Sequence, residues 1–485
     1  MTAAGYIERL ASGNGGRRGL ALLALILLVG LGLRLGYAWD PWQPQDPDAQ
    51  GYARIAASLE RFGTFSQQGN FAPSDIQPAS NYSPGLPLLV AGTYKVSGGV
   101  NPRLARLILA LIGSVAVLLT YLLGRRLGGP AAGLIAAAAI AIYPALLQYQ
   151  GMFMTEPLAA TLLAGALLAF FWAGDRGSPL AYALPGILLG ALALVRPEYL
   201  VFGAILPLLA LLRIWRAGSW RPGALAAGVM LMAFVLPVLP WTIHNAVTLH
   251  RFVPVSTGGG KVLWVGTYLQ AGGDGPRARQ ELLEHRPALR RKLATDYQPR
   301  FPSDPTPWEL FALAKPLDTG IDPEVRFSQR LPYSDFIEQE KTFDTYAHHV
   351  YPDIPVDSAL SRLGKENLER DLRDHPLAYG GLLAQKSWFA WYQGARHVML
   401  AFPWLVLHAL IVIFGLIGLV VLAIRRRWEA IVVALVALAA TALSALLIAS
   451  PRRVIVILPL IAAFGGVAVT WLASWLRERR APAAP

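Results

Sequence analysis

Residues 20–37 of this chain read LALLALILLVGLGLRLGY. An α-helix needs a run of about 20 predominantly apolar residues to cross the hydrocarbon core of a bilayer. Arg17 and Arg18 precede the run, and Arg34 and Trp39 stand where a small-residue cleavage site would end a signal peptide. The run therefore predicts an uncleaved signal anchor with its amino terminus inside the cell.

Nine more apolar runs follow the first one, and each is close to the length that a membrane span requires. They lie at residues 104–123, 131–147, 154–173, 180–195, 200–214, 224–241, 399–424, 430–448 and 454–476. Together the runs predict an all-α polytopic membrane protein with about ten spans.

The composition agrees with a membrane protein. Of the 485 residues, 54% are hydrophobic and only 15% are charged, whereas a soluble domain usually carries about 25% charged residues. This balance excludes a soluble enzyme, a disordered chain and a collagenous chain. The sequence has no cysteine, so a disulfide framework, thiolate catalysis and a Cys-based metal site are excluded as well.

Arginine gathers in alternate turns between the apolar runs. The turns at 125–126, 176, 213–221, 425–427 and 477–480 all fall on the side of the N-terminus. The positive-inside rule then places both termini in the cytoplasm and two long polar segments outside. The net charge of +13 suits the anionic inner leaflet, and nucleic-acid binding is not expected because the basic residues form no continuous stripe.

The two polar segments divide the chain into three parts. Residues 1–241 are expected to form an N-terminal transmembrane module, which includes the first outer segment at 40–101. Residues 242–396 are expected to form a partly helical extracytoplasmic loop domain, and residues 397–485 a C-terminal transmembrane module. We find no internal repeat, so the sequence does not support an inverted-repeat transporter.

The first outer segment contains the stretch DPDAQGYARIA at residues 46–56. Helical spacing places Tyr52 and Ile55 on one face with Asp48, close to the membrane surface. Asp is a favoured N-cap, so capping is the simpler interpretation of Asp48. In the other interpretation, partial desolvation raises its basicity and Asp48 is a general base. Asp46 and Asp48 together could also hold a divalent cation.

Several charged residues stand at the outer ends of spans, where topology does not require them. Glu156 opens the fourth span, and Arg196 ends the fifth. Arg452 and Arg453 precede the last span. Snorkelling explains any one of these arginines alone, but several guanidinium groups on one face would suit a phosphate, which Arg binds in a bidentate fork.

Seven short motifs occur in a fixed order along the chain. They are Asp-x-x-x-Tyr-x-x-x-Ala at 48–56, Pro-Gly-x-Pro-Leu at 84–88, Thr-Glu-Pro at 155–157, Arg-Pro-Glu at 196–198, Pro-Trp-Thr-x-x-Asn at 240–245, Phe-Val-Pro-x-Ser-Thr-x-Gly-Gly at 252–260 and an Arg-rich turn at 451–454. In this order they resemble the motifs of the GT-C glycosyltransferases, in the bacterial branch similar to protein O-mannosyltransferases and the aminoarabinose transferase of lipid A. The chain departs from that pattern at Tyr82-Ser83 and at His244, where the family commonly has Arg.

The resemblance implies a GT-C-like transmembrane helix bundle with juxtamembrane helices on its outer face. It also implies an inverting glycosyltransferase of the plasma (inner) membrane and cell envelope, with its active site facing the periplasm or the outside. The donor would be a sugar on a polyprenyl phosphate, and the acceptor a hydroxyl of a glycan, lipid or protein.

The resemblance also implies roles for individual residues. Asp48 would be the catalytic base, with Asp46 and Glu156 in supporting roles. The donor phosphate would be bound by Arg196, Arg452 and Arg453, with His244 and Lys261 next in line. The substrate pocket would include Tyr52, Tyr82, Trp241 and Asn245.

Two other functions stay open on the sequence alone. One is a transporter or flippase for a lipid-linked sugar, and the other is a non-catalytic envelope assembly protein. A transporter would need charged residues deep in its spans, and the middle parts of the apolar runs are almost free of charge.

Overall fold

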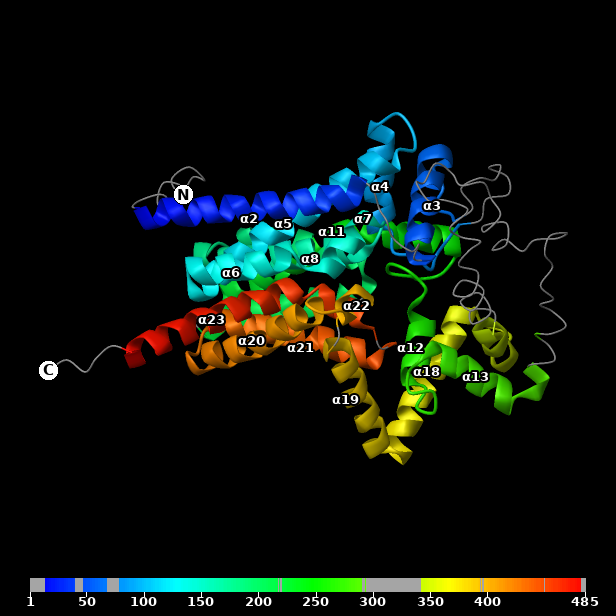
Figure 1. Ribbon diagram of the computed structural model, residues 1–485. Coiled ribbons are helices and arrows are strands. Elements are labelled where there is room, and N and C mark those ends of the chain that lie inside the picture. Colours follow the sequence, from blue (N-terminus) through cyan, green and yellow to red (C-terminus); the bar gives the residue numbers. More distant parts are fainter. Residues whose placement is uncertain are drawn as a thin grey trace.

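The computed structural model describes residues 14–39, 47–67, 78–216, 218, 220–289, 293, 342–392, 394, 397–448 and 450–480. Every regular element within these ranges is a helix. The long helices lie side by side as a bundle (Figure 1). The start of α2 (Asn14–Trp39) and the end of α23 (Leu458–Arg480) lie together at one end, which we call the termini end.

Within the described ranges, eight helices are long and apolar enough to cross a membrane. Besides α2 and α23 they are α5 (Pro102–Gly128), α8 (Thr155–Arg176), α10 (Phe202–Arg216) with the short η3 (Pro197–Val201) before it, α11 (Trp220–Leu249), α20 (Trp404–Ile424) and α21 (Trp428–Leu446). These helices match eight of the ten predicted runs. The predicted all-α polytopic fold is confirmed.

The remaining two runs form shorter helices. The run at 180–195 forms η2 (Pro179–Tyr182) and α9 (Ala183–Val195). The run at 131–147 forms α6 (Pro130–Ala141) and α7 (Pro144–Gly151), which are bent by 51° at the break between them.

A buried arginine of α2 satisfies the carbonyls at this break. Pro144 has no N–H to donate to the carbonyl oxygen of Ile140, four residues before it. The Arg34 guanidinium donates instead, to Ile140 at 3.2 Å and to Ala141 at 3.1 Å. Arg34, Ile140 and Ala141 are all buried, and a buried carbonyl without a donor would cost about 1–3 kcal/mol. Arg34 therefore stabilises the break between α6 and α7, and the break sets the direction of α7 relative to α6.

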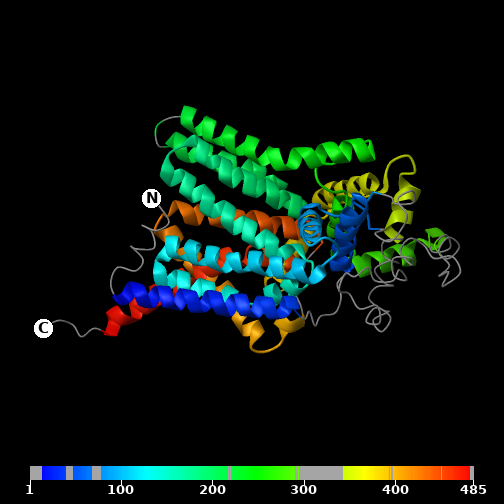
Figure 2. The same ribbon diagram turned by 90° about the horizontal axis from the view of Figure 1, so that it is seen from above.

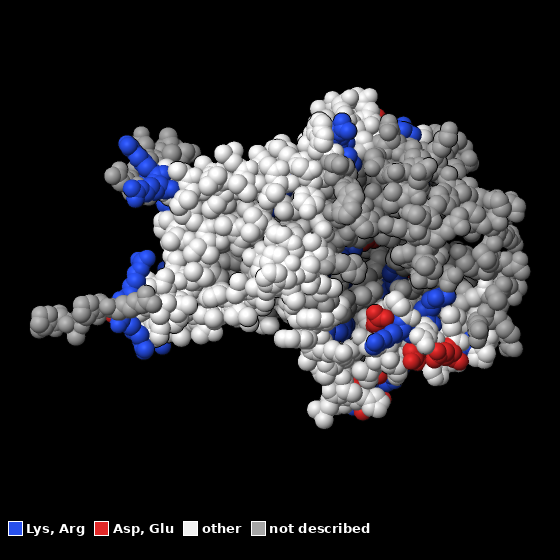
Figure 3. Space-filling view, in the orientation of Figure 1, with Lys and Arg blue, Asp and Glu red and all other residues white. Residues whose placement is uncertain are grey.

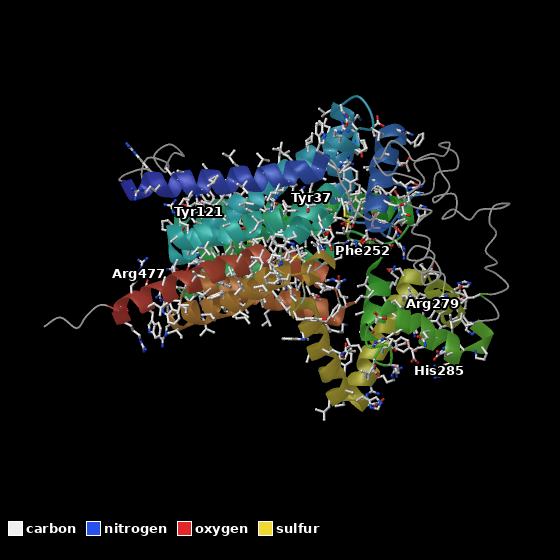
Figure 4. All side chains as sticks on the ribbon, viewed as in Figure 1. Tyr37, Tyr121, Phe252, Arg279, His285 and Arg477 are labelled. Carbon is white, nitrogen blue, oxygen red and sulfur yellow. The ribbon has the colours of Figure 1, made fainter. Side chains whose placement is uncertain are left out.

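The surface of the bundle has the charge distribution of a multi-pass membrane protein. On the face shown, an uncharged band covers the helices, and Lys and Arg side chains appear at both of its ends (Figure 3). Arg477 lies at the termini end, whereas Tyr37 lies near the opposite end of the bundle (Figure 4). An uncharged band between two charged ends is what the hydrocarbon core of a bilayer selects.

The remaining helices gather at and beyond the opposite end of the bundle, which we call the loop end (Figures 1 and 2). They are α3 (Pro47–Phe62), α4 (Gly85–Val96), α12 (Gly259–Thr267), α13 (Gly275–His285), α18 (Val356–Asp374), α19 (Pro376–Tyr392), η4 (His397–Leu400) and α22 (Pro451–Ile455). A small core around Trp264, Phe343 and Leu363 holds α12, α13 and α18 together. Helix α11 runs to Leu249, so the predicted boundary at residue 242 lies inside a helix.

Candidate functional site

A guanidinium group joins two carboxylates at the loop end of the bundle. Arg452 Nη1 lies 2.9 Å from Asp48 Oδ2, and its Nε lies 2.8 Å from Glu156 Oε1. The first of these pairs joins residues 404 positions apart in the sequence. The predicted base and the predicted supporting carboxylate are thus held on the same arginine.

The ion pairs continue from Glu156 into the protein. Arg196 Nη1 lies 3.2 Å from Glu156 Oε1, and its Nη2 lies 2.7 Å from Glu198 Oε1. Arg453 Nε follows at 3.9 Å from the same oxygen of Glu198. We call Asp48, Arg452, Glu156, Arg196, Glu198 and Arg453 the ion-pair network; it contains three carboxylates and three guanidinium groups.

Helix ends position every member of the network. Asp48 lies in the first turn of α3 and Glu156 in the first turn of α8, where a carboxylate complements the positive end of the helix dipole. Arg196 is the residue after α9, and Arg452 and Arg453 belong to α22. Asp48 is the second residue of α3, so it lies inside the helix and not at the N-cap position.

Burial changes along the network. The Glu156 side chain is 0% exposed, whereas the side chains of Asp48 and Arg452 are 39% and 29% exposed. The second carboxylate oxygen of Glu156 is buried with no hydrogen-bond partner among the described residues. The Asp48 end can therefore meet a molecule from solvent, while the Glu156 end is enclosed.

Two predicted pocket residues lie close to Asp48. The rings of Tyr52 and Tyr82 meet edge to face, with their centroids 5.0 Å apart. Gly51 allows this packing, because a Cβ there would come within 2.4 Å of the Tyr82 ring. Burial raises the pKa of the Tyr52 phenol above its ordinary value, and the charge of Asp48 raises it further, so the phenol stays neutral.

Two other predicted pocket residues hold a loop. Trp241 Nε1 donates to the Val255 carbonyl at 2.8 Å, and the Asn245 amide donates to the carbonyls of Val253 and Val255 at 3.0 Å. His244 is exposed on the same helix, and its ring packs against Trp241. The Pro-Trp-Thr-x-x-Asn motif thus anchors the segment that leads to the glycine triplet.

The glycine triplet attaches α12 to α18. The Gly260 N–H donates to Asp357 Oδ1 at 2.9 Å, and a Cβ on Gly260 would come within 2.1 Å of the Asp357 carbonyl oxygen. Burial raises the pKa of Asp357, while the nearby positive charges of Arg251 and Lys261 act against the rise. Lys261 follows Gly260 in α12, so the structure places it at the contact between α12 and α18.

Comparison with known protein families gives one match. Residues 81–241, about a third of the chain, match the family model described as dolichyl-phosphate-mannose-protein mannosyltransferase. This stretch includes Glu156, Arg196 and Glu198 of the ion-pair network. No curated protein matched the whole sequence closely enough to count as a relative.

Solved structures resemble the chain over nearly its full length. The apo oligosaccharyltransferase of Archaeoglobus fulgidus superposes with a TM-score of 0.53 at 18% identity, over 96% of this chain and 51% of that one. This chain has the GT-C fold. The predicted resemblance to GT-C glycosyltransferases is therefore confirmed at the level of the fold.

Other solved structures match as well. AglB of Archaeoglobus fulgidus, in complex with an inhibitory peptide and a dolichol-phosphate, gives a TM-score of 0.53 at 17% identity, over 96% of this chain and 52% of that one. ArnT of Cupriavidus metallidurans, bound to undecaprenyl phosphate, gives 0.37 at 16% identity, over 94% and 78%. The chain spans about half the length of the oligosaccharyltransferase structures.

The predicted cation site rested on Asp46 and Asp48. Asp46 lies outside the described residues. Within the ranges that the structure describes, no three His, Cys, Asp or Glu side chains gather as a metal site. The position between Asp48 and Glu156 is taken by the Arg452 guanidinium.

Sequence reasoning missed one buried cation. Lys386 on α19 is buried, and its ammonium donates to the Gly266 carbonyl at 2.8 Å. Burial lowers the pKa of Lys386 to about 7, and the charge of Arg453 lowers it further. The signal was present in the sequence, because Lys386 is the only charged residue between Pro376 and Tyr392.

The lowered pKa of Lys386 predicts how stability depends on pH. Between pH 7 and 10.5 the unfolded chain binds this proton and the folded protein does not, so stability rises with pH in that window. The rise is at most about 1.4 kcal/mol per pH unit. Thermal unfolding in detergent should show it in the wild type, and Lys386→Met should remove it. A wild type and variant with parallel pH profiles would disprove this prediction.

Proposed function

We propose that this protein is a membrane glycosyltransferase that moves a sugar from a polyprenyl phosphate to an acceptor hydroxyl, with inversion at the anomeric carbon. Asp48 is the general base of the reaction. Arg452, Arg453 and Arg196 stabilise the phosphate, and Tyr52 and Tyr82 form part of the pocket. The acceptor hydroxyl belongs to a glycan, a lipid or a protein.

The observation that carries this proposal is the ion-pair network. It joins a half-exposed carboxylate to guanidinium groups from two other helix ends, at the end of a membrane bundle. A base for the acceptor and cations for a phosphate are the two requirements of transfer from a lipid phosphate. An ordinary group of surface ion pairs would leave its carboxylates in water, whereas Glu156 is completely buried.

The proposed step exchanges one carbon–oxygen bond for another. The acceptor oxygen attacks the anomeric carbon from the side opposite the phosphate, and its proton passes to the Asp48 carboxylate. The bond between the anomeric carbon and the phosphate oxygen breaks, and its electron pair leaves with the polyprenyl phosphate. Guanidinium groups stabilise the charge that builds on that phosphate.

The names of similar proteins support a lipid-phosphate donor. The family model that matches residues 81–241 is described by a dolichyl-phosphate-mannose donor. The AglB structure of the same fold was solved with a dolichol-phosphate. Both names describe a sugar carrier made of a long isoprenoid and a phosphate.

The test is a transfer assay with the purified protein in lipid nanodiscs. A polyprenyl-phosphate donor with a radiolabelled sugar should pass its label to an envelope acceptor fraction and release polyprenyl phosphate. The same sugar on a nucleotide should give no transfer. Movement of the intact donor across a vesicle membrane, without cleavage of the sugar, would instead support a flippase.

The proposed active site faces the outside of the plasma membrane, and both termini lie inside. The chain has no native cysteine, so single cysteines report their side cleanly. Lys365→Cys on α18 should react with an impermeant maleimide added to intact cells. Leu180→Cys, exposed at the turn after α8, should react only after the cells are opened. The reverse pattern would invert the orientation.

Arg452→Lys should weaken use of the donor more than use of the acceptor. The Arg452 fork bridges two oxygens at once, and the single ammonium of Lys cannot reproduce it. We expect the KM for donor to rise by about tenfold or more, equivalent to about 1.4 kcal/mol. Arg425→Lys, on the exposed turn after α20, is the matched control. Equal kinetics for both variants would remove Arg452 from the donor site.

A further inference from the structure

Helix α19 has an exposed face without a single charge. The most exposed of its large side chains are Leu377, 91% exposed, and Trp388, 69% exposed. The only charged residue of the helix, Lys386, is buried on the opposite side. The exposed face consists of Leu377, Ala378, Gly380, Gly381, Ala384, Gln385, Trp388, Phe389 and Tyr392.

The neighbouring helix of the same hairpin has the opposite character. Helix α18 is separated from α19 by His375 alone, yet most of its exposed residues are charged. These are Arg362, Lys365, Glu366, Glu369, Arg370, Arg373 and Asp374. The two helices of this hairpin therefore expose faces of opposite polarity. This difference indicates that the two faces meet different surroundings.

The position of α19 favours lipid as its surroundings. The helix crosses the direction of the spans at the loop end and extends past the side of the bundle (Figure 1). Trp391 Nε1 donates to Thr441 Oγ1 of α21 at 3.3 Å, and the Trp391 carbonyl contacts His408 Nε2 of α20 at 2.6 Å. These contacts fix the end of α19 on the first turns of α20 and the last turns of α21.

The uncharged face of α19 continues into the apolar surface of the spans. Leu400 and Phe402, between α19 and α20, are exposed. Leu405 and Val406 in the first turn of α20 are exposed as well. A span faces lipid along such residues, and α19 extends that surface around the loop end. Helix α19 is not among the candidate spans, so we do not expect it to cross the membrane.

We propose that α19 lies in the plane of the membrane, at the boundary between headgroups and acyl chains of the leaflet at the loop end. Its partner on the uncharged face is the bilayer itself. The stacked rings of Trp388 and Tyr392, 5.9 Å apart, lie where aromatic side chains prefer the interface. An interfacial helix of this kind buries its apolar face by about 5–10 Å.

This placement also sets the depth of the ion-pair network. With one face in lipid, α19 carries Lys386 on its other face, and α19 packs against α22, which holds Arg453. Both cations then lie near the level at which lipid phosphates lie. The inference stands on the surface chemistry of α19 and does not depend on the proposed transfer reaction.

Spin labels on single cysteines test the placement in the full chain in nanodiscs. Gly381→Cys is suitable because a Cβ there meets no atom within 4 Å, and Lys365→Cys on α18 is the matched control. The label at residue 381 should relax faster with oxygen, which concentrates in lipid, than with a water-soluble nickel chelate. The label at residue 365 should show the reverse. Ala384→Cys, one turn along the same face, should repeat the result of residue 381.

Two outcomes would overturn the inference. Equal access of the nickel chelate to residues 381 and 365 would place α19 in water. Protection of residue 381 from both reagents would mean that protein covers the face, such as a second copy of the chain. Neither outcome involves catalysis, so the placement of α19 is tested independently of the proposed sugar transfer.

Discussion

Asp48→Asn should lower the turnover of sugar transfer by about two to four orders of magnitude. The variant keeps an oxygen that can accept from Arg452 Nη1, now 2.9 Å from the carboxylate, so the ion-pair network keeps its shape. The variant loses the ability to take a proton at neutral pH, together with one negative charge of the network. The measurement is the initial rate at saturating donor and acceptor, with purified protein of normal thermal stability.

The alternative interpretation of Asp48 makes a different forecast for the same variant. If Asp48 only complemented the helix dipole at the start of α3, Asn would cost about 0.3–1 kcal/mol of stability and leave turnover nearly unchanged. Glu60→Gln, later on the same helix, is the control for charge removal from α3. Turnover within a factor of a few of wild type would exclude Asp48 as the base, and Asp46 would be tested next.

Glu156→Ala should destabilise the protein by about 3–5 kcal/mol, because it leaves buried charges without their shared partner. Glu156 holds Arg452 at 2.8 Å and Arg196 at 3.2 Å, and its side chain is fully buried. The measurement is the thermal unfolding midpoint in detergent, together with the yield of folded protein in the membrane.

An exposed ion pair supplies the control for this prediction. Glu366 pairs with Arg362 one turn away on α18, and both side chains are exposed. Glu366→Ala should therefore cost well under about 1 kcal/mol. Glu156→Gln should fall between the two, since it keeps the volume and one acceptor oxygen. Equal midpoints for Glu156→Ala and Glu366→Ala would mean that the network contributes nothing to stability.

Hydropathy alone was sufficient to predict the bundle. Each predicted run corresponds to a helix or a pair of helices, because crossing lipid demands long apolar segments with internally paired backbones. What hydropathy could not predict is the break in the run at 131–147. That break depends on Pro144 and on Arg34, which lies 106 positions before the carbonyl of Ile140 that it reaches.

The candidate site was predictable in its parts but not in its connections. The charges at span ends identified Glu156, Arg196, Arg452 and Arg453, since an unneeded charge at a membrane surface is unusual. Sequence spacing carries no information on which of them meet, so the contact between Asp48 and Arg452 had to come from the fold. Lys386 was missed because it lay in a segment interpreted as an aqueous loop domain.

The ion-pair network is electroneutral, and this bears on how a donor would enter. A phosphate that approaches Arg452 meets a guanidinium already engaged by Asp48 and Glu156, so binding is a change of partners. The easier partner to displace is Asp48, which is half-exposed, while Glu156 is enclosed. On the proposed function, seating the donor would then set the base free in the same movement. This coupling predicts that the donor must bind before the acceptor. Product-inhibition patterns would reveal that order.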